Sequence, residues 1–128
     1  MLQPEWRHDD ERGPFRLLLV EDDTLVADVL REILETEYLV DCAASVSEAL
    51  TLLRGSHIHL ALIDSTLPDG RGSDLDQPAR DTGTRIIHMS GDPEPLLHPA
   101  MRGGPYLQKP FSATVLLNTL RQVLQGPA

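Results

Sequence analysis

The sequence contains a single cysteine, few aromatic residues and no long apolar run. Cys42 has no partner for an intrachain disulfide, so a reducing compartment fits and a cytoplasmic location is expected. No apolar run approaches the roughly 18 residues of a membrane span, so we expect no membrane interaction. Because aromatic residues make up only 4% of the chain, the core must be built from Leu, Val, Ile and Ala.

Positive charge is also scarce. The chain has 11 Lys and Arg residues against 20 Asp and Glu residues, which gives a formal net charge of -9. This balance argues against direct binding to nucleic acid or to an anionic membrane surface. Two interpretations of the acid excess stay open, namely solubility and a cluster of carboxylates that holds a metal cation.

The remaining composition is that of one globular domain with alternating elements. A chain of 128 residues suits one domain, and 41% hydrophobic residues allow a sizeable core. We expect a flexible N-terminal tail over 1–13 and a folded domain over 14–128. Apolar runs and helical periodicity predict five strands and their intervening helices; the strands are 17–20, 38–42, 58–63, 84–89 and 106–108, and the clearest helices follow at 24–34, 45–55, 73–80 and 112–124. This alternation is typical of a parallel sheet with helices on both faces.

Two of these predicted strands end in acidic residues. The run Leu60–Ile63 has the length of a fully buried strand, and Asp64 follows it immediately, before a turn with Pro and Gly. The first strand likewise runs into Glu21 and Asp22. Open α/β sheets place their chemistry at the carboxyl ends of their strands. We therefore expect these carboxylates to lie close together.

Four short motifs, in this order and in these slots, carry a family resemblance. The motifs are Val20-Glu21-Asp22-Asp23, Asp64 with Leu67-Pro68-Asp69-Gly70, His88-Met89-Ser90-Gly91 and Tyr106-Leu107-Gln108-Lys109-Pro110-Phe111. With these motifs, the chain resembles the receiver domain of bacterial two-component response regulators over roughly residues 15–125.

The resemblance implies a flavodoxin-like α/β fold, with a five-stranded parallel sheet of order 2-1-3-4-5. It implies that Asp64 accepts a phosphoryl group from a histidine on a sensor histidine kinase or a histidine phosphotransfer protein. Such a chain is a phosphoacceptor signalling domain and not an enzyme, beyond its own phosphoryl transfer and autodephosphorylation. It would signal through a downstream protein.

The chemistry of the residues agrees with that implication. A carboxylate can attack phosphorus, and the charge on the transferring group must then be neutralised by cations. Mg²⁺ prefers oxygen ligands. Asp22, Asp64 and the backbone carbonyl of Thr66 could supply them, with Glu21 binding through water. Lys109 could pair with one phosphoryl oxygen and Ser90 could donate a hydrogen bond to another.

The family resemblance adds two further expectations, a cis Lys109–Pro110 peptide and a switch role for Tyr106 on activation. Structural interpretations of the same residues stay open at this point. Glu21 and Asp22 could form a solvated turn, Ser90 could belong to a simple turn, and Tyr106 could be an ordinary half-buried strand residue. The histidines have no metal-ligand spacing and are expected to have no special role; they are His8, His57, His59, His88 and His98.

The chain departs from the family in two helix slots. The segment 93–102 contains several prolines and is closed by Gly103-Gly104-Pro105, which predicts a short or irregular segment, more mobile than the sheet. The slot after the third strand is shortened and contains Pro78.

Alternative functions therefore stay open. The chain could be a receiver fragment of a larger regulator or hybrid kinase, or a pseudo-receiver that acts as a constitutive protein-binding module. A small flavodoxin-like enzyme is disfavoured because no Gly-rich phosphate loop follows the first strand. Since 128 residues leave no room for an output domain, we expect output by protein binding or phosphate relay.

Overall fold

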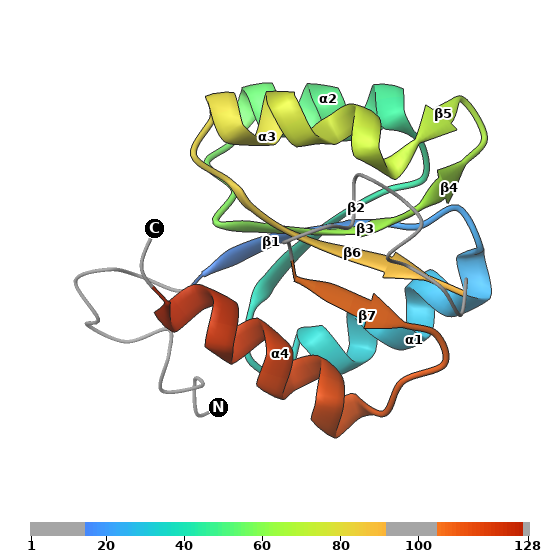
Figure 1. The fold of residues 1–128 in the computed structure, drawn as a ribbon, viewed down its shortest axis with the longest axis vertical. Helices are drawn as coiled ribbons and strands as arrows, with labels where there is room; N and C mark the ends of the chain where they lie inside the picture. The colour runs from blue at the N-terminus through green and yellow to red at the C-terminus, as the bar shows by residue number, and fades with distance from the viewer. Residues whose placement is uncertain (1–14, 92–104, 127–128) are drawn as a thin grey trace, which may run out of the picture.

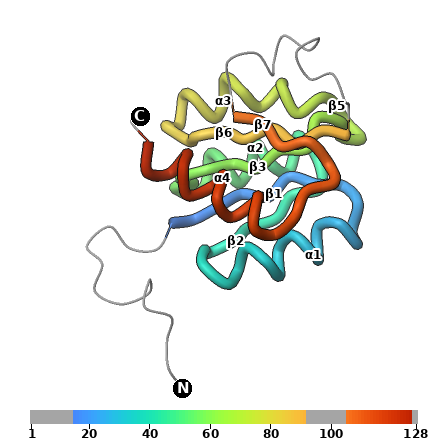
Figure 2. Tube along the Cα trace, turned by 60° about the horizontal axis from the view of Figure 1, so that its bottom comes forward, coloured from blue at the N-terminus to red at the C-terminus, as the bar shows by residue number. Residues whose placement is uncertain are grey.

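A computed structural model of the protein describes residues 15–91 and 105–126. Its centre is a five-stranded parallel sheet of order β2-β1-β3-β6-β7, which Figure 2 shows from strand to strand. The strands are β1 (Arg16–Val20), β2 (Leu39–Ala43), β3 (Leu60–Asp64), β6 (Arg85–Ser90) and β7 (Tyr106–Gln108). The predicted flavodoxin-like fold and strand order are confirmed, because β6 and β7 are the fourth and fifth strands of this sheet.

Helices cover both faces of the sheet. In Figure 1, α2 (Val46–Gly55) and α3 (Asp76–Asp81) lie on one face, and α1 (Thr24–Leu34) and α4 (Ala113–Gln125) lie on the other. Within the described residues no helix is both long enough and apolar enough to cross a membrane. The carboxyl ends of the strands all point to the right in Figure 1. Residues that follow the strands therefore meet along that edge.

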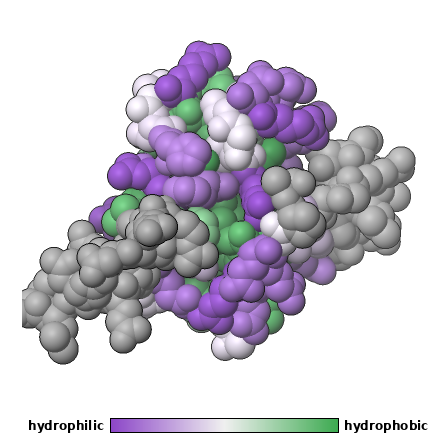
Figure 3. All heavy atoms as spheres, turned by 90° about the vertical axis from the view of Figure 1, so that its left-hand side faces the viewer, coloured by the Kyte–Doolittle hydropathy of each residue, from purple (hydrophilic) through white to green (hydrophobic). Residues whose placement is uncertain are grey.

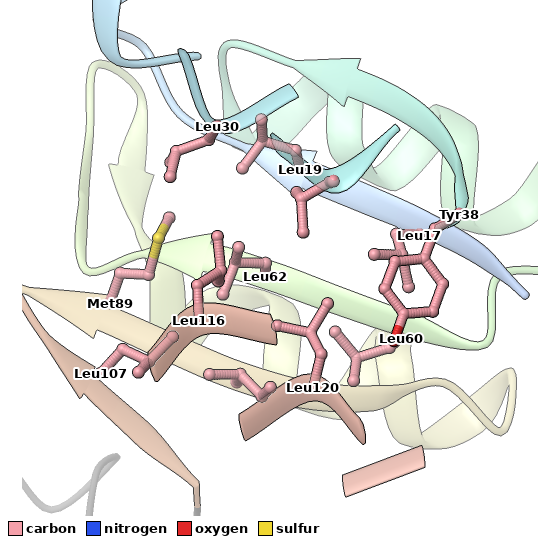
Figure 4. Close-up of a cluster of buried hydrophobic side chains, with 12 residues drawn as sticks. Leu17, Leu19, Leu30, Tyr38, Leu60, Leu62, Met89, Leu107, Leu116 and Leu120 are labelled. Atoms are coloured by element: carbon pink, nitrogen blue, oxygen red, sulfur yellow. The ribbon is translucent and has the colours of Figure 1, made fainter. Parts of the chain in front are cut away.

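The alternation of side chains along each strand builds two separate cores. On β1, Leu17 and Leu19 pack toward α1 and α4, whereas Leu18 and Val20 pack into the other layer with α2. Figure 4 shows the first of these cores, in which leucines of β1, β3, α1 and α4 lie between Met89 on one side and Tyr38 on the other. Both faces of β1 and β3 are buried, which fixes the register of the strands that lead to the acidic residues.

Local capping explains where the helices begin. The Asp23 carboxylate accepts hydrogen bonds from the Leu25 and Val26 amides and caps α1. Ser45 caps α2 and Ser112 caps α4 in the same manner. Side-chain oxygens at these positions satisfy amides that have no helical acceptor. Asp23 is thus committed to α1.

Several details differ from the expectations. Three strands begin one or two residues later than predicted, whereas α2 ends at Gly55 as predicted. A 3₁₀ turn at Gly72–Leu75 precedes α3, and Pro78 lies in the first turn of α3, where its missing N–H has little consequence. A two-stranded hairpin, β4 (Thr66–Leu67) with β5 (Gly70–Arg71), was not predicted. The tail 1–13 and the proline-containing segment 93–102 lie outside the described residues.

Candidate functional site

Three carboxylates gather at the carboxyl edge of the sheet. Val20 and Ile63 are partners in the β1–β3 register, so the residues that follow them leave the sheet side by side. One oxygen from each of Glu21, Asp22 and Asp64 lies within 4.8 Å of the others. The expected gathering is therefore observed. We call these three residues the carboxylate cluster.

Glu21 is the buried member of the carboxylate cluster, with 3% of its surface exposed. One of its carboxylate oxygens lies 2.7 Å from the Lys109 Nζ, and the other accepts a hydrogen bond of 3.2 Å from the Asp23 amide. A buried charge is tolerated when it is paired and hydrogen-bonded in this way. Asp22 is exposed and Asp64 is half-buried, so these two carboxylates are the more accessible ones.

Lys109 follows β7, the last strand in the order of the sheet, and connects that strand to the carboxylate cluster. Its Nζ lies 2.7 Å from Glu21 and 3.4 Å from the Asp64 Oδ2, and its amide donates a 2.7 Å hydrogen bond to the Ser90 carbonyl. Burial lowers the pKa of Lys109, but the hydrogen bond with Glu21 and the charge of Asp64 outweigh burial and raise it above the ordinary value. Lys109 is the only lysine in the chain. The peptide bond to Pro110 is cis, as the resemblance implied.

The loop after β3 is held close to Asp64. The Ser65 amide donates to the Met89 carbonyl at 2.9 Å, and the Gly72 amide donates to the Ser65 carbonyl at 3.0 Å. A Cβ at Gly72 would approach the Asp64 carbonyl oxygen to 2.3 Å, so only glycine allows this close packing. Thr66 is exposed and begins β4 within this loop.

The other predicted site residues lie at the carboxyl end of β6 and on β7. Ser90 is buried, ends β6, and lies next to Met89, which is the register partner of Asp64. Tyr106 is half-buried and pairs with His88 in the β6–β7 register. Ser90 therefore borders the carboxylate cluster, whereas Tyr106 begins β7, two positions before Gln108, the register partner of Ser90.

Two contacts near the site were missed by the sequence analysis. The buried His88 ring places its Nε2 atom 2.9 Å from an Asp76 carboxylate oxygen of α3, a structural contact that the sequence analysis did not predict. A polar residue two positions before Ser90, inside an apolar strand, was the available signal, because buried polar groups need partners. The Lys109–Glu21 ion pair was also missed, since the lysine was assigned only to a phosphoryl group.

The arrangement suits a hard divalent cation. The carboxylate cluster offers oxygen ligands only, it is open to solvent at Asp22, and its donor set matches the preference of Mg²⁺. A single ammonium group lies against it, on the side of Glu21 and Asp64. Such a site can bring a cation and a lysine to bear on a group that reacts with Asp64.

Comparison with known proteins places this architecture in a family. The model of the response regulator receiver domain matches residues 17–121, which includes the carboxylate cluster, Ser90 and Lys109. The chain belongs to the response regulator receiver family. Receiver domains are signalling domains of two-component systems, and they interact with histidine kinases or phosphotransfer proteins.

Individual relatives agree with this assignment. The receiver is 33% identical over 114 residues to the response regulator RppA of Synechocystis (83% of this chain, 49% of RppA). It is 28% identical over 116 residues to the uncharacterized transcriptional regulatory protein YbdJ of Bacillus subtilis (87% of this chain, 51% of YbdJ). The chain thus spans about half the length of these two relatives.

Solved structures show the same fold. A CheY-like receiver domain protein from Methanospirillum hungatei is 30% identical, with a TM-score of 0.78 over 88% of this chain and 94% of that one. The receiver domain of the sensor histidine kinase PA1611 from Pseudomonas aeruginosa is 23% identical, with a TM-score of 0.79 over 89% of this chain and all of that one. The PA1611 structure has a magnesium ion in its active-site cleft.

Proposed function

We propose that this receiver accepts a phosphoryl group on Asp64 in a Mg²⁺-dependent reaction. The observation that carries the proposal is the carboxylate cluster, with oxygens within 4.8 Å of one another and Lys109 between Glu21 and Asp64. The magnesium ion in the PA1611 receiver supports the choice of cation by analogy. Asp22, Asp64 and the Thr66 carbonyl would hold the ion, and Glu21 would bind through water.

The covalent step follows from carboxylate chemistry. An Asp64 carboxylate oxygen attacks the phosphorus of a phosphohistidine, the phosphorus–nitrogen bond breaks, and an acyl phosphate forms. The departing imidazole keeps the electron pair of that bond and takes up a proton. Bound Mg²⁺ supplies positive charge that offsets the phosphoryl oxygens. Lys109 supplies the second positive charge, and its 3.4 Å contact with Asp64 keeps it within reach.

Ser90 and Tyr106 have proposed roles after transfer. Ser90, at the carboxyl end of β6, would donate its hydroxyl hydrogen to a phosphoryl oxygen, and Tyr106 would respond as the switch residue. The Tyr106 ring resonances should shift on phosphorylation, and this shift should be lost in Ser90→Ala. Unchanged Tyr106 resonances in phosphorylated wild type would remove Tyr106 from the proposal.

The phosphoryl donor we propose is a sensor histidine kinase or a histidine phosphotransfer protein, and the output is contact with a downstream protein. Residues 14–128 would form the receiver unit. An alternative is a pseudo-receiver with one fixed binding surface. The retained Glu21–Lys109–Asp64 contacts favour the phosphorylated form, because a fixed surface needs neither a buried acid nor its lysine partner.

Intact mass tests the proposal. With Mg²⁺ and acetyl phosphate, or with a histidine-phosphorylated protein donor, the wild type should gain one phosphoryl group that both acid and base release. Asp64→Asn should gain none from either donor, because an amide oxygen is too weak a nucleophile. Equal labelling of Asp64→Asn would show that the nucleophile is misassigned. No labelling of folded wild type by either donor would favour the pseudo-receiver.

A further inference from the structure

Asp69 makes a contact that the proposed chemistry does not use. Its carboxylate accepts hydrogen bonds from the Val46 amide at 2.7 Å and from the Ser47 amide at 3.0 Å. Both amides belong to the first turn of α2, where no helical carbonyl is available to them. These amides lower the pKa of Asp69, so its carboxylate is ionised at neutral pH and is committed to α2.

The contact adds hydrogen bonds between the hairpin tip and α2 to the packing that already joins them in the core. Asp69 lies at the tip of the β4–β5 hairpin, between Leu67 and Gly70. The base of this loop is already tied to β6 through the Ser65 amide, and Leu67 is buried in the core beneath α2. Thr66 therefore lies between two anchors, one at Ser65 and one at Asp69.

We infer that Asp69 is a positioning residue for the metal site. By tying the hairpin tip to α2, it holds the Thr66 carbonyl at the place where it and Asp64 can share one cation. The inference rests on the proposed function, because it assumes that Thr66 is a ligand. Outer contacts that orient metal ligands commonly contribute about tenfold or more to metal affinity. The two amides donate to different oxygens of the Asp69 carboxylate, Val46 to Oδ1 and Ser47 to Oδ2, whereas an asparagine side chain would offer them a single acceptor oxygen.

Ser45 provides a matched control. Its Oγ accepts a hydrogen bond of 3.1 Å from the Glu48 amide at the same end of α2, and this bond stays within the helix and does not reach the hairpin. Ser45→Ala and Asp69→Ala should therefore both weaken the start of α2. Only Asp69→Ala should release the loop that carries Thr66.

The test is a Mg²⁺ titration of the full chain in the absence of phosphodonor. Binding is monitored through the rise in melting temperature. We expect the dissociation constant for Mg²⁺ to rise about tenfold in Asp69→Ala and less than about twofold in Ser45→Ala, with Asp69→Asn between them. At saturating Mg²⁺, the rate of labelling by acetyl phosphate should return to the wild-type value. Titrations at 0.15 and 0.5 M KCl separate position from charge, because salt screens the long-range attraction between Asp69 and Mg²⁺, whereas an effect of loop position should persist as a difference between Asp69→Ala and wild type at both salt concentrations.

Equal Mg²⁺ affinity in Asp69→Ala and wild type would overturn the inference while leaving the proposed function intact. So would equal losses in Asp69→Ala and Ser45→Ala, since the effect would then belong to α2 alone. A wild type that binds no Mg²⁺ would overturn both proposals. If Asp69→Ala does not fold, Asp69→Asn gives the same comparison with Ser45→Ala, with a smaller expected difference.

Discussion

The amino ends and the carboxyl ends of the same five strands carry very different chemistry. We call these two sides of the sheet the amino edge and the carboxyl edge. At the amino edge, the Arg16 amide donates to the His59 Nδ1 atom at 3.0 Å, and the Thr84 hydroxyl donates to the Ile58 carbonyl at 2.8 Å. Figure 3 looks onto this side of the molecule, where hydrophilic residues surround smaller apolar areas. At the carboxyl edge, the carboxylate cluster shares one ammonium group. The hydrogen bonds at the amino edge are thus matched polar pairs, whereas the three carboxylates at the carboxyl edge are only partly compensated by Lys109.

Elementary electrostatics gives a scale for this difference. Two like charges 4 Å apart repel by about 1 kcal/mol in water and about 4 kcal/mol at an effective dielectric constant of 20. Lys109 offsets part of this repulsion between Glu21 and Asp64, and Asp22 remains exposed to solvent. The excess of negative charge at the carboxyl edge costs stability in the metal-free protein. A cation that binds the folded protein but not the unfolded chain would restore this stability.

The largest effect should come from Lys109→Ala. Without the lysine, the buried carboxylate of Glu21 loses its charged partner, so the free energy of unfolding should fall by about 2–3 kcal/mol. Mg²⁺ should restore more stability to this variant than to wild type. Urea unfolding at pH 7 to 9, with and without Mg²⁺, measures both effects.

Arg121→Ala is the matched control for Lys109→Ala. Arg121 pairs with Glu37 at 2.7 Å on the exposed surface, and such pairs contribute about 1 kcal/mol or less.

The pKa of Lys109 is raised, so its stabilisation is complete below the ordinary value of 10.5 and is lost as pH rises through the folded value. The gap between wild type and Lys109→Ala should therefore be constant from pH 7 to 9. A Lys109→Ala variant as stable as wild type would contradict the stabilising role of the Lys109–Glu21 ion pair.

A smaller effect is expected at the amino edge. Burial lowers the pKa of His59, and the neighbouring His57 lowers it further. The folded state therefore favours the neutral ring, so stability is complete above pH 6.5 and falls as pH drops toward the folded pKa. His59→Asn keeps an acceptor for the Arg16 amide but does not titrate, and it should show a flatter stability profile between pH 7 and 5.

His59→Ala separates the hydrogen bond from the titration. Relative to His59→Asn, it should cost about 1 kcal/mol across this pH range, because the Arg16 amide loses its acceptor and neither variant titrates at position 59. Urea midpoints across this pH range distinguish the three proteins. If His59→Asn keeps the wild-type slope, another group is responsible for it.

The sequence was informative where a buried apolar run is followed directly by charged residues. Buried strands followed at once by acids predicted both the sheet and the gathering of Glu21, Asp22 and Asp64, because register on a two-sided core allows few alternatives. The hairpin was missed because two-residue strands have no periodic signal. The Glu21–Lys109 and His88–Asp76 pairs were missed because they join residues far apart in sequence. The roles of all the predicted site residues stay predictions, those of Asp64 and Lys109 included.

The most direct test of the carboxylate cluster is thermal melting of wild type and Asp22→Asn at neutral pH, with and without millimolar Mg²⁺. Asp22→Asn should melt about 3 °C higher than wild type without Mg²⁺, because one repelling charge is gone. It should lose the Mg²⁺-dependent rise in melting temperature that wild type shows. Asp23→Asn is the control, since asparagine also caps a helix well and should leave the Mg²⁺ response unchanged. An Asp22→Asn variant that melts lower without Mg²⁺ and keeps the full Mg²⁺ response would show that these carboxylates do not share a metal pocket.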